Sequence, residues 1–385
     1  MKIKGFKNSL ILTEKGLIKT NLIIKDGIID FIGEIESNDL IELDENKIII
    51  PGFIDQHIHG LSGYDVIDGK VEAIEKIASE LPKEGVTAFL PTTTTEEIEV
   101  INKSLKCINE YINKDNKDGS LVLGVHLEGP FISNDYLGAQ LPEYVLKPNK
   151  ENFKEFEKNS NNNIKLVTLA PEEDDDLIQY LKSKNIVVSI GHSSANYEDV
   201  KLAISKGVSC LTHTFNGMKG IHHREIGTAG SALLFDELYS EVICDGIHVS
   251  NPALKLLFKN KPTDKVILIS DSVRMKNLNN GIYYDGKQKV ILKNNEARLE
   301  NGVLVGSVLK INEAVRNIIK YTGVDFSTAI KYATINPATN LGVDHLMGSI
   351  KEGKLANLVV VDKDINVYLT IRNGNIIYKR SKYEL

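Results

Sequence analysis

Cysteine and long apolar runs are scarce in this chain of 385 residues. Its three cysteines, Cys107, Cys210 and Cys244, are odd in number and form no CxxC pair, so we expect no disulfide framework and a reducing compartment. No apolar run approaches the roughly 20 residues that a membrane span needs. The N-terminal residues also lack the apolar stretch and the small-residue cleavage site of a signal peptide. These absences predict a cytoplasmic protein with no membrane partner.

An excess of positive charge is also lacking, because the formal net charge is −6. Nucleic-acid-binding proteins present a basic face, so we expect no nucleic-acid partner. An anionic small molecule is not excluded, since a pocket needs only a few local cations. The hydrophobic fraction of 42% and the charged fraction of 25% are typical of a globular protein with a sizeable core.

Both ends of the chain are rich in short β-type runs. Near the N-terminus two such runs meet at Lys25-Asp26-Gly27, and near the C-terminus two meet at Asn373-Gly374. Both sequences are typical of a tight hairpin turn. The pattern predicts one small β-domain built from residues 1–50 and 345–385.

The middle of the chain, residues 51–344, alternates between apolar runs and helix-like segments. Parallel buried strands read as continuous apolar runs, and eight strand–helix units predict a (β/α)₈ barrel. The expected strands are 53–60, 86–93, 121–128, 164–170, 186–192, 209–214, 241–247 and 265–271. The expected helices include 70–85, 174–185, 307–321, 325–334 and 336–342.

Polar residues stand where six of these apolar runs end. In a barrel the carboxyl ends of the strands converge on one site, and core packing does not account for such a pattern. The residues are His57, His59, His126, Glu128, His192, His213, Asn216, Asp245, His248 and Asp271.

His57 and His59 are two positions apart on an extended segment, so both side chains face the same side. Imidazole nitrogen and carboxylate oxygen are ligands for zinc and related divalent ions. A single HxH pair is a weak signal, but Glu128, His192 and His213 at neighbouring strand ends strengthen it, and together they predict a metal site. A hydrogen-bonded core position explains His126 equally well, so it is not counted as a ligand.

Asp271 is the candidate acid and base beside this site. A metal lowers the pKa of bound water to about 7 and polarises a carbonyl, and a nearby carboxylate can take up and return the proton. A helix N-cap or a structural carboxylate remains an alternative for Asp271.

A second cluster, His222, His223 and Arg224, together with His248, suits an anion because arginine presents a fork that matches phosphate. A solvated basic loop is the alternative there.

Twelve short motifs then identify a resemblance that covers nearly the whole chain. Among them, in order, are "PGFIDQHIHG", "HLEGPFIS", "GHSSA", "THTFNGM", "HHREIG", "CDGIHV", "ISDSVR" and "GSIKEGKLANLVVVD". In order and spacing the chain resembles the N-acetylglucosamine-6-phosphate deacetylases of the amidohydrolase superfamily. The resemblance implies a (β/α)₈ barrel with a β-sandwich made from both chain ends. It also implies metal-dependent hydrolysis of the acetamide of N-acetyl-D-glucosamine 6-phosphate in amino-sugar catabolism.

The resemblance also implies roles for single residues. Glu128, His192 and His213 match the shared metal ligands, His57 and His59 match a pair that completes a second metal site, and Asp271 matches the catalytic acid and base. Two divalent ions per subunit are therefore expected, zinc first and iron, manganese or cobalt as alternatives. A homodimer is expected, in which Arg224 reaches the partner subunit's site. The positions that match substrate contacts are Ala139, Gln140, Asn216, Gly217, Arg224, His248, Leu304, Val305 and Gly306.

Three features qualify the resemblance. The fourth expected strand ends in "VTLAPE" and lacks the metal-bridging lysine of many superfamily members, which argues against a cyclic amidase and makes Glu128 the substitute. Gln140 stands where some relatives have a histidine; glutamine can donate a hydrogen bond but not a proton, so carbonyl polarisation is expected to shift to the second metal. Ser194 also departs from the commoner motif.

Two alternatives stay open at this point. One is a deacetylase for the galactosamine or mannosamine epimer. The other is a sugar-phosphate-binding protein without catalysis, although such a protein would be expected to have lost Asp271 or a metal ligand, and the sequence keeps all of them.

Overall fold

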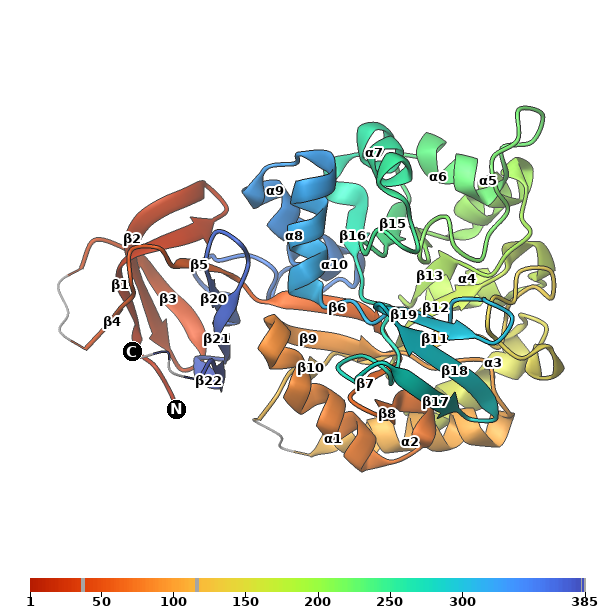
Figure 1. The fold of residues 1–385 in the computed structure, drawn as a ribbon, viewed down its shortest axis with the longest axis horizontal. Coiled ribbons are helices and arrows are strands. Elements are labelled where there is room, and N and C mark those ends of the chain that lie inside the picture. Colours follow the sequence, from red (N-terminus) through yellow and green to blue (C-terminus); the bar gives the residue numbers. More distant parts are fainter. Residues whose placement is uncertain (36–38, 115–117, 382, 384–385) are drawn as a thin grey trace.

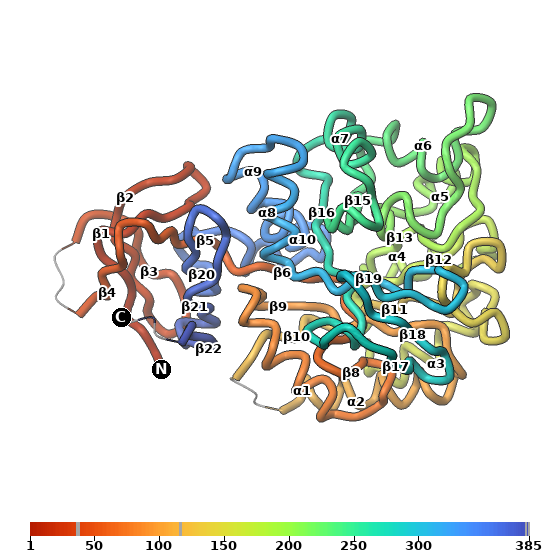
Figure 2. The backbone as a smooth tube through the Cα atoms, in the orientation of Figure 1, coloured from red at the N-terminus to blue at the C-terminus, as the bar shows by residue number. Residues whose placement is uncertain are grey.

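The computed structural model describes residues 1–35, 39–114, 118–381 and 383. The two ends of the chain meet in one sheet at one side of the molecule, and the middle of the chain forms a larger α/β part beside it (Figure 1). The backbone trace in Figure 2 shows both termini on the small part. Residues 36–38, 382 and 384–385 of the predicted terminal domain lie outside the described residues.

The terminal sheet has eight strands in the order β22-β21-β20-β5-β1-β2-β3, with β4 paired to β1. The two predicted hairpins are confirmed: Lys25 pairs with Ile28 and Arg372 pairs with Asn375. Both turns need left-handed backbone, with φ of 82° at Gly27 and 73° at Gly374, which glycine adopts without steric cost. The strands are β1 Gly5–Thr13, β2 Gly16–Lys25, β3 Ile28–Gly33, β4 Ile41–Glu42, β5 Ile48–Pro51, β20 Leu358–Val361, β21 Val367–Arg372 and β22 Asn375–Lys379.

Both chain ends contribute to one core in this sheet. Phe6, Leu22 and Ile29 from the N-terminal strands are buried in the same cluster as Leu358 and Ile371 from the C-terminal strands. The two ends therefore bury apolar surface against each other.

The middle of the chain contains parallel strands in two sheets, β10-β9-β6 and β11-β12-β13-β14-β15-β16. Each of the eight expected runs contains or overlaps a strand. Parallel bridges from Thr92 to His126 and from Ile58 to Ser272 connect the two sheets at both ends. The strands are β6 Phe53–Ile58, β9 Val86–Pro91, β10 Leu121–Val122, β11 Val125–Glu128, β12 Ile164–Leu169, β13 Val187–Ile190, β14 Cys210–Leu211, β15 Tyr239–Val242 and β16 Val266–Leu268.

Helices follow most of these strands, and α1 shows how such a helix buries one face. In α1 the buried residues Ala73, Ile74, Ile77 and Ala78 have helical spacing and form a stripe toward the core. The α-helices are α1 Val71–Glu80, α2 Ile98–Asn113, α3 Lys150–Asn159, α4 Leu177–Ser183, α5 Tyr197–Lys206, α6 Gly227–Leu234, α7 Asn251–Asn260, α8 Ile311–Thr322, α9 Phe326–Lys331 and α10 Ile335–Asn340. Short 3₁₀ helices and one small hairpin complete this part: η1 Val66–Asp68, η2 Leu81–Glu84, η3 Pro142–Tyr144, η4 Pro171–Glu173, η5 Thr263–Lys265, β7 Gly60–Leu61 and β8 Tyr64–Asp65.

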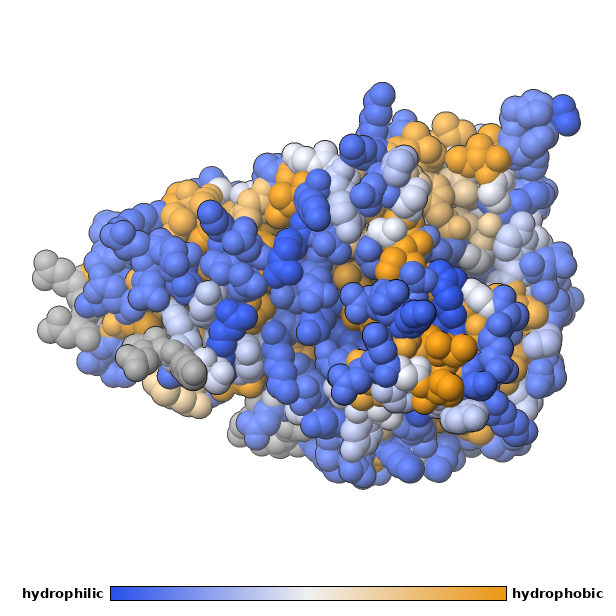
Figure 3. Space-filling view, in the orientation of Figure 1, coloured by the Kyte–Doolittle hydropathy of each residue, from blue (hydrophilic) through white to orange (hydrophobic). Residues whose placement is uncertain are grey.

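A three-stranded antiparallel sheet between β16 and α8 was not expected from the sequence. It comprises β17 Gly281–Asp285, β18 Gln288–Lys293 and β19 Glu296–Leu299. Val290, Leu292 and Ala297 bury one face of it. Ile282 and Ile291 stay exposed on the other, where Figure 3 shows a hydrophobic patch.

In the described part of the chain, no helix combines the length and the hydropathy needed to cross a membrane.

A buried ion pair ties three of these segments together. Lys276 Nζ lies 2.8 Å from Glu84 Oε2, and both side chains are almost fully buried. The same oxygen accepts a hydrogen bond from the N–H of Ile311 at the start of α8. Glu84 therefore links the end of η2, the segment after β16 and the first turn of α8.

We predict that Glu84→Gln lowers the free energy of unfolding by about 3–5 kcal/mol, because a buried lysine is left without its counter-charge. Urea or thermal unfolding followed by circular dichroism measures this change. Glu75→Gln is the matched control, since the Lys114–Glu75 pair is exposed and exposed pairs contribute little. Equal effects of the two substitutions would contradict the prediction.

Candidate active site

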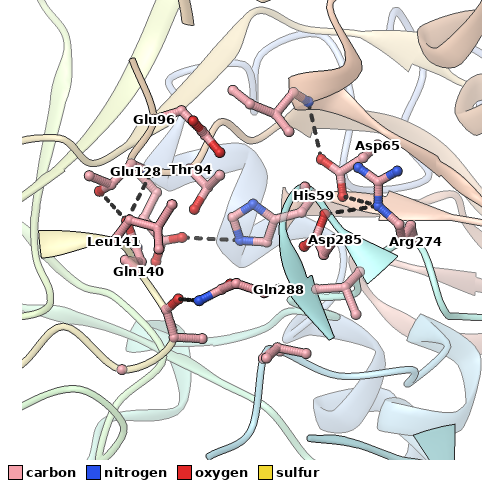
Figure 4. Close-up of a pocket in the computed structure, with 18 of the residues that line it drawn as sticks. His59, Asp65, Thr94, Glu96, Glu128, Gln140, Leu141, Arg274, Asp285 and Gln288 are labelled. Carbon is pink, nitrogen blue, oxygen red and sulfur yellow. Dashed lines mark hydrogen bonds and ion pairs between the residues drawn. The ribbon is translucent and has the colours of Figure 1, made fainter. Parts of the chain in front are cut away.

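A cavity of about 810 Å³ opens at the carboxyl ends of the parallel strands. Most of the predicted site residues line it, from segments that follow β6, β11, β13, β14 and β16. In Figure 4, His59 and Glu128 are in contact near the middle of the view, Gln140 and Leu141 lie on one side, and Arg274 and Asp285 lie on the other. The predicted convergence of strand ends is therefore observed.

Glu128 lies at the centre of four histidines. Its Oε2 atom is 3.4 Å from His57 Nε2 and 3.0 Å from His59 Nε2. Its Oε1 atom is 3.3 Å from His192 Nε2 and 3.0 Å from His213 Nε2. Each carboxylate oxygen thus faces one pair of imidazole nitrogens.

These side chains form two groups that could hold metal ions, one of His57, His59 and Glu128 and one of Glu128, His192 and His213. His57 Nε2 is buried and makes no hydrogen bond to any described residue. A nitrogen lone pair without a partner, beside carboxylate oxygens, fits a divalent cation. The donor set therefore suits a metal chemically as well as geometrically.

The electrostatics of the cluster favour positive charge. Burial alone would lower the pKa of His59, but its hydrogen bonds to Asp271 and Glu128 raise it to about 10. Burial would likewise lower the pKa of His57, yet the charges of Glu128 and Asp271 raise it well above the usual value. Burial would raise the pKa of Glu128, but the surrounding histidines hold it well below the usual range. The site accordingly attracts cations, whether protons or metal ions.

Left-handed backbone aims three of the side chains. The φ angles are 49° at His192, 29° at His213 and 46° at Asp271. Such values are uncommon outside glycine and cluster at functional sites. Each of these residues directly follows or lies just beyond a parallel strand, so the sharp turn points its side chain into the cavity rather than along the strand.

Oxygen acceptors fix the orientation of three of the rings. His192 Nδ1 lies 2.8 Å from the Tyr136 carbonyl, and His213 Nδ1 lies 3.1 Å from the Asn216 carbonyl. His57 Nδ1 lies 3.0 Å from Glu241 Oε2. An Nδ1–H that donates to oxygen leaves the Nε2 lone pair free to face Glu128, as expected of metal-binding histidines.

Asp271 lies on the His57 side of the cluster. Its Oδ1 atom is 3.3 Å from His57 Nε2 and 3.2 Å from His59 Nε2. Its N–H donates to the His57 carbonyl at 2.9 Å, which joins the segment after β16 to β6. The alternative of a helix N-cap for Asp271 is therefore wrong: no helix begins after it until α8 at Ile311 in the described chain.

Gln140 projects its amide toward the centre of the cavity. Its Oε1 atom accepts hydrogen bonds from the hydroxyl of Thr95 and, at 3.0 Å, from the N–H of Thr95. Its Nε2 atom therefore faces inward, 3.2 Å from His192 Nε2. The other predicted sugar contacts, Ala139, Asn216, Gly217, Leu304, Val305 and Gly306, also line the cavity.

The two predicted phosphate contacts are separated. His248 lines the cavity, with Nδ1 2.6 Å from Asp245 Oδ2, and its buried Nε2 atom makes no hydrogen bond to a described residue. Arg224 is exposed, lies 2.8 Å from His223 Nε2, and is absent from the described residues that line the cavity. One chain alone does not bring Arg224 to the site.

Ser194 and His126 make their hydrogen bonds to residues outside the cluster. Ser194 Oγ donates to Glu172 Oε1 at 3.0 Å. The serine at this departure from the commoner motif therefore hydrogen-bonds the Glu172 carboxylate. His126 Nε2 lies 2.7 Å from Thr168 Oγ1, and His126 Nδ1 lies 3.3 Å from Thr92 Oγ1. Both ring nitrogens lie within hydrogen-bond distance of threonine hydroxyls, and the ring packs edge-on against the His57 ring, with 4.5 Å between the centroids. His126 is therefore a hydrogen-bonded residue behind the cluster and not a member of it.

Sequence reasoning missed the wall formed by β17 and β18. Arg274 donates to Asp285 at 2.9 Å and to Asp68 at 3.0 Å, and Gln288 Nε2 donates to the Ala139 carbonyl at 3.2 Å. These contacts attach the wall to both sides of the cavity. Arg274 stands in the motif "ISDSVR", but nothing in the sequence indicated its partners, and no motif marked Gln288. Glu241 was also missed, although a charged residue inside the apolar run "SEVIC" was an available signal.

Comparisons with known proteins show what the chain is similar to. The family model described as "Amidohydrolase family" matches residues 48–377. The chain is 38% identical to the N-acetylglucosamine-6-phosphate deacetylase of Bacillus subtilis, over 97% of this chain and 96% of that protein. It is 35% identical to the N-acetylgalactosamine-6-phosphate deacetylase of Escherichia coli O157:H7, over 93% and 94%. The crystal structure of N-acetylglucosamine-6-phosphate deacetylase from Thermotoga maritima superposes with a TM-score of 0.89 at 34% identity, covering 98% and 100%.

We predict that the purified protein retains two equivalents of divalent metal, measured by elemental mass spectrometry after metal-replete purification. The double variant His57→Ala/His59→Ala should retain one equivalent, because Glu128, His192 and His213 stay intact. Glu128→Gln should weaken both sites, since each site uses one of its oxygens.

Gln288→Ala is the control and should keep both equivalents, because Gln288 lines the cavity wall without touching the cluster. Less than one equivalent in the wild type would count against any metal, and a double variant that kept the wild-type content would exclude the second site.

Proposed function

The chain belongs to the amidohydrolase family, and on that premise we propose that it hydrolyses N-acetyl-D-glucosamine 6-phosphate to D-glucosamine 6-phosphate and acetate, a step of amino-sugar catabolism. The observation that carries the proposal is the Glu128 carboxylate shared by four imidazoles, with Asp271 beside it, at the base of the cavity. The named activities of the relatives supply the substrate class. The galactosamine epimer is the second candidate, because one similar relative carries that name.

We propose that residues 51–344 form a closed (β/α)₈ barrel and that residues 1–50 and 345–385 form a β-sandwich domain. The unbroken parallel order from β11 to β16, with bridges back to β6 and β9, supports the barrel. Among the described residues all three cysteines are free thiols, which supports a cytoplasmic location.

His57, His59 and Glu128 hold one ion in this proposal, and Glu128, His192 and His213 hold the other. Zinc suits this set of imidazole and carboxylate ligands, with iron, manganese or cobalt as alternatives. A divalent metal at such a site lowers the pKa of water to about 7 and polarises a carbonyl oxygen. The departure at Gln140 from the histidine of some relatives fits a site with both ions.

Asp271 moves the proton. Burial would raise its pKa, but the charges of His57 and His59 lower it, so the carboxylate is ionised at neutral pH and acts as a base. It takes a proton from the attacking water and returns it to the leaving nitrogen, which would otherwise depart as a poor amide anion. The position of its Oδ1 atom beside the candidate metal ligands, 3.2 Å from His59 Nε2, supports this role.

Gln140 orients the acetyl group in this scheme. Thr95 fixes its carbonyl oxygen, so its NH₂ group donates to the acetyl oxygen of the substrate. The sugar is bound by the residues that line the rest of the cavity, namely Ala139, Asn216, Gly217, Leu304, Val305 and Gly306.

His248 and Arg224 bind the phosphate, and Arg224 comes from the partner subunit of a homodimer. The free Nε2 atom of His248 supports the first contact. The exposed position of Arg224, away from its own cavity, supports the second, since a guanidinium fork suits phosphate and a two-fold dimer exchanges the same loop between subunits.

We predict that the wild-type protein releases acetate from N-acetyl-D-glucosamine 6-phosphate, measured by a coupled assay over a panel of phosphorylated and free N-acetyl sugars. Asp271→Asn should keep metal and substrate binding but lose roughly 10²–10⁴-fold in kcat, because asparagine cannot accept the proton.

Asp135→Asn is the control and should stay near wild type, because Asp135 is an exposed residue outside the cluster. An Asp271→Asn variant within a few-fold of wild-type kcat would show that Asp271 is structural. No acetate release from any sugar of the panel would contradict the proposed function.

We predict that Arg224→Ala raises KM for the phosphorylated sugar far more than for the free sugar, without loss of metal. The control Lys201→Ala removes an exposed cation of α5 and should change neither KM. A mixture of Arg224→Ala and Asp271→Asn subunits should recover toward roughly a quarter of wild-type activity, since half of the dimers are mixed and each holds one intact site. No recovery after demonstrated subunit exchange would place the arginine in its own chain or away from phosphate.

A further inference from the structure

Glu241 lies in the middle of β15 and carries a carboxylate into the interior of the parallel sheet. Its side chain is fully buried, and its neighbours in the strand, Ser240 and Val242, are buried as well. A carboxylate in such a place is costly unless it is hydrogen-bonded. Its partners therefore indicate what it is for.

Both oxygens of Glu241 are occupied by donors. Gln56 Nε2 donates to Oε1 at 2.6 Å. His57 Nδ1 lies 3.0 Å from Oε2, and the N–H of His213 lies 3.4 Å from the same atom. Two of these donors, His57 and His213, belong to the two candidate metal groups.

Each hydrogen bond in this buried series fixes the direction of the next one. Asn340 Nδ2 donates to Gln56 Oε1 at 3.1 Å, so the Gln56 amide must turn its NH₂ group toward Glu241. An ionised carboxylate only accepts hydrogen bonds, so His57 carries its proton on Nδ1. In the neutral ring that a metal ion binds, the lone pair of His57 is then on Nε2, the atom that lies 3.4 Å from Glu128 Oε2 and 3.3 Å from Asp271 Oδ1.

His59 offers a contrast within the same group. Its buried Nδ1 atom makes no hydrogen bond to a described residue, so no acceptor fixes its tautomer. Within the pair, only His57 has a described side chain as hydrogen-bond partner of its Nδ1 atom, and that side chain is Glu241.

We propose that Glu241 is a positioning residue: it sets the tautomer and the ring orientation of His57 and so determines the affinity of the metal site formed by His57, His59 and Glu128. This inference rests on the second metal of the proposed function. Partners behind a metal-binding histidine typically contribute 10–100-fold in metal affinity. The site of Glu128, His192 and His213 keeps its own carbonyl acceptors and should not depend on Glu241 in this way.

The test compares Glu241→Leu, Glu241→Gln and Gln56→Leu with the wild type by zinc titration against a chromophoric chelator. Glu241→Leu removes the acceptor and should weaken one of the two zinc sites by roughly 10–100-fold while the other site changes little. Glu241→Gln offers one acceptor oxygen to two donors, Gln56 and His57, because its own NH₂ group cannot accept, and it should recover only part of the affinity. Gln56→Leu disturbs the same buried chain but leaves the acceptor of His57 in place, and it should stay within a few-fold of the wild type.

Circular dichroism verifies that each variant is folded, and if Glu241→Leu does not fold, Glu241→Asp replaces it, because a side chain one methylene shorter withdraws the acceptor and keeps the charge. Equal loss in Gln56→Leu and Glu241→Leu, or unchanged affinity in all variants, would overturn the positioning role. A wild type that binds two zinc ions and releases acetate, with a Glu241→Leu variant that keeps both sites, refutes this inference alone. A wild type with one zinc ion refutes the two-metal site itself.

Discussion

The contact between Glu128 and four imidazoles is the interaction on which the rest of the site depends. Each oxygen of this buried carboxylate lies 3.0–3.4 Å from two Nε2 atoms. A buried anion is stable only where positive charge compensates it. Glu128 and Asp271 raise the pKa values of His57 and His59 against the effect of burial, so the cluster favours such positive charge. The parallel strands serve this contact, because only their shared carboxyl edge brings β6, β11, β13 and β14 to one point.

Two features hold the four imidazole rings at one carboxylate: hydrogen-bond acceptors at the Nδ1 atoms, and the backbone conformation of the ligand residues. The carbonyls of Tyr136 and Asn216 and the carboxylate of Glu241 accept from three Nδ1 atoms. The left-handed conformations of His192, His213 and Asp271 each cost about 1–3 kcal/mol. Packing of the strands on either side offsets that cost, because a strained turn keeps its conformation, and its side chain keeps its direction, only when the flanking elements are fixed.

Residues farther from the cluster form the wall of the cavity and the candidate phosphate contacts. The sheet of β17–β19 closes one wall of the cavity through Arg274 and Gln288. His248 lines the same cavity with a buried Nε2 atom that no described residue hydrogen-bonds, while Arg224 lies on an exposed loop. In the proposed function the chemistry is therefore complete within one chain, whereas recognition of the phosphate needs two.

The sequence by itself determined the parallel strands, the terminal hairpins and the set of polar residues at the strand ends. Those features are local: buried strands are apolar throughout, and the turn at Asp26-Gly27 needs left-handed backbone that few residues adopt. Only the tertiary structure decided which side chains meet. Glu241 contacts His57 across 184 positions, and Arg274 contacts Asp68 across 206. No periodicity encodes such pairs, because a buried charge is identified by its partners, and the partners become neighbours only when the sheet is assembled.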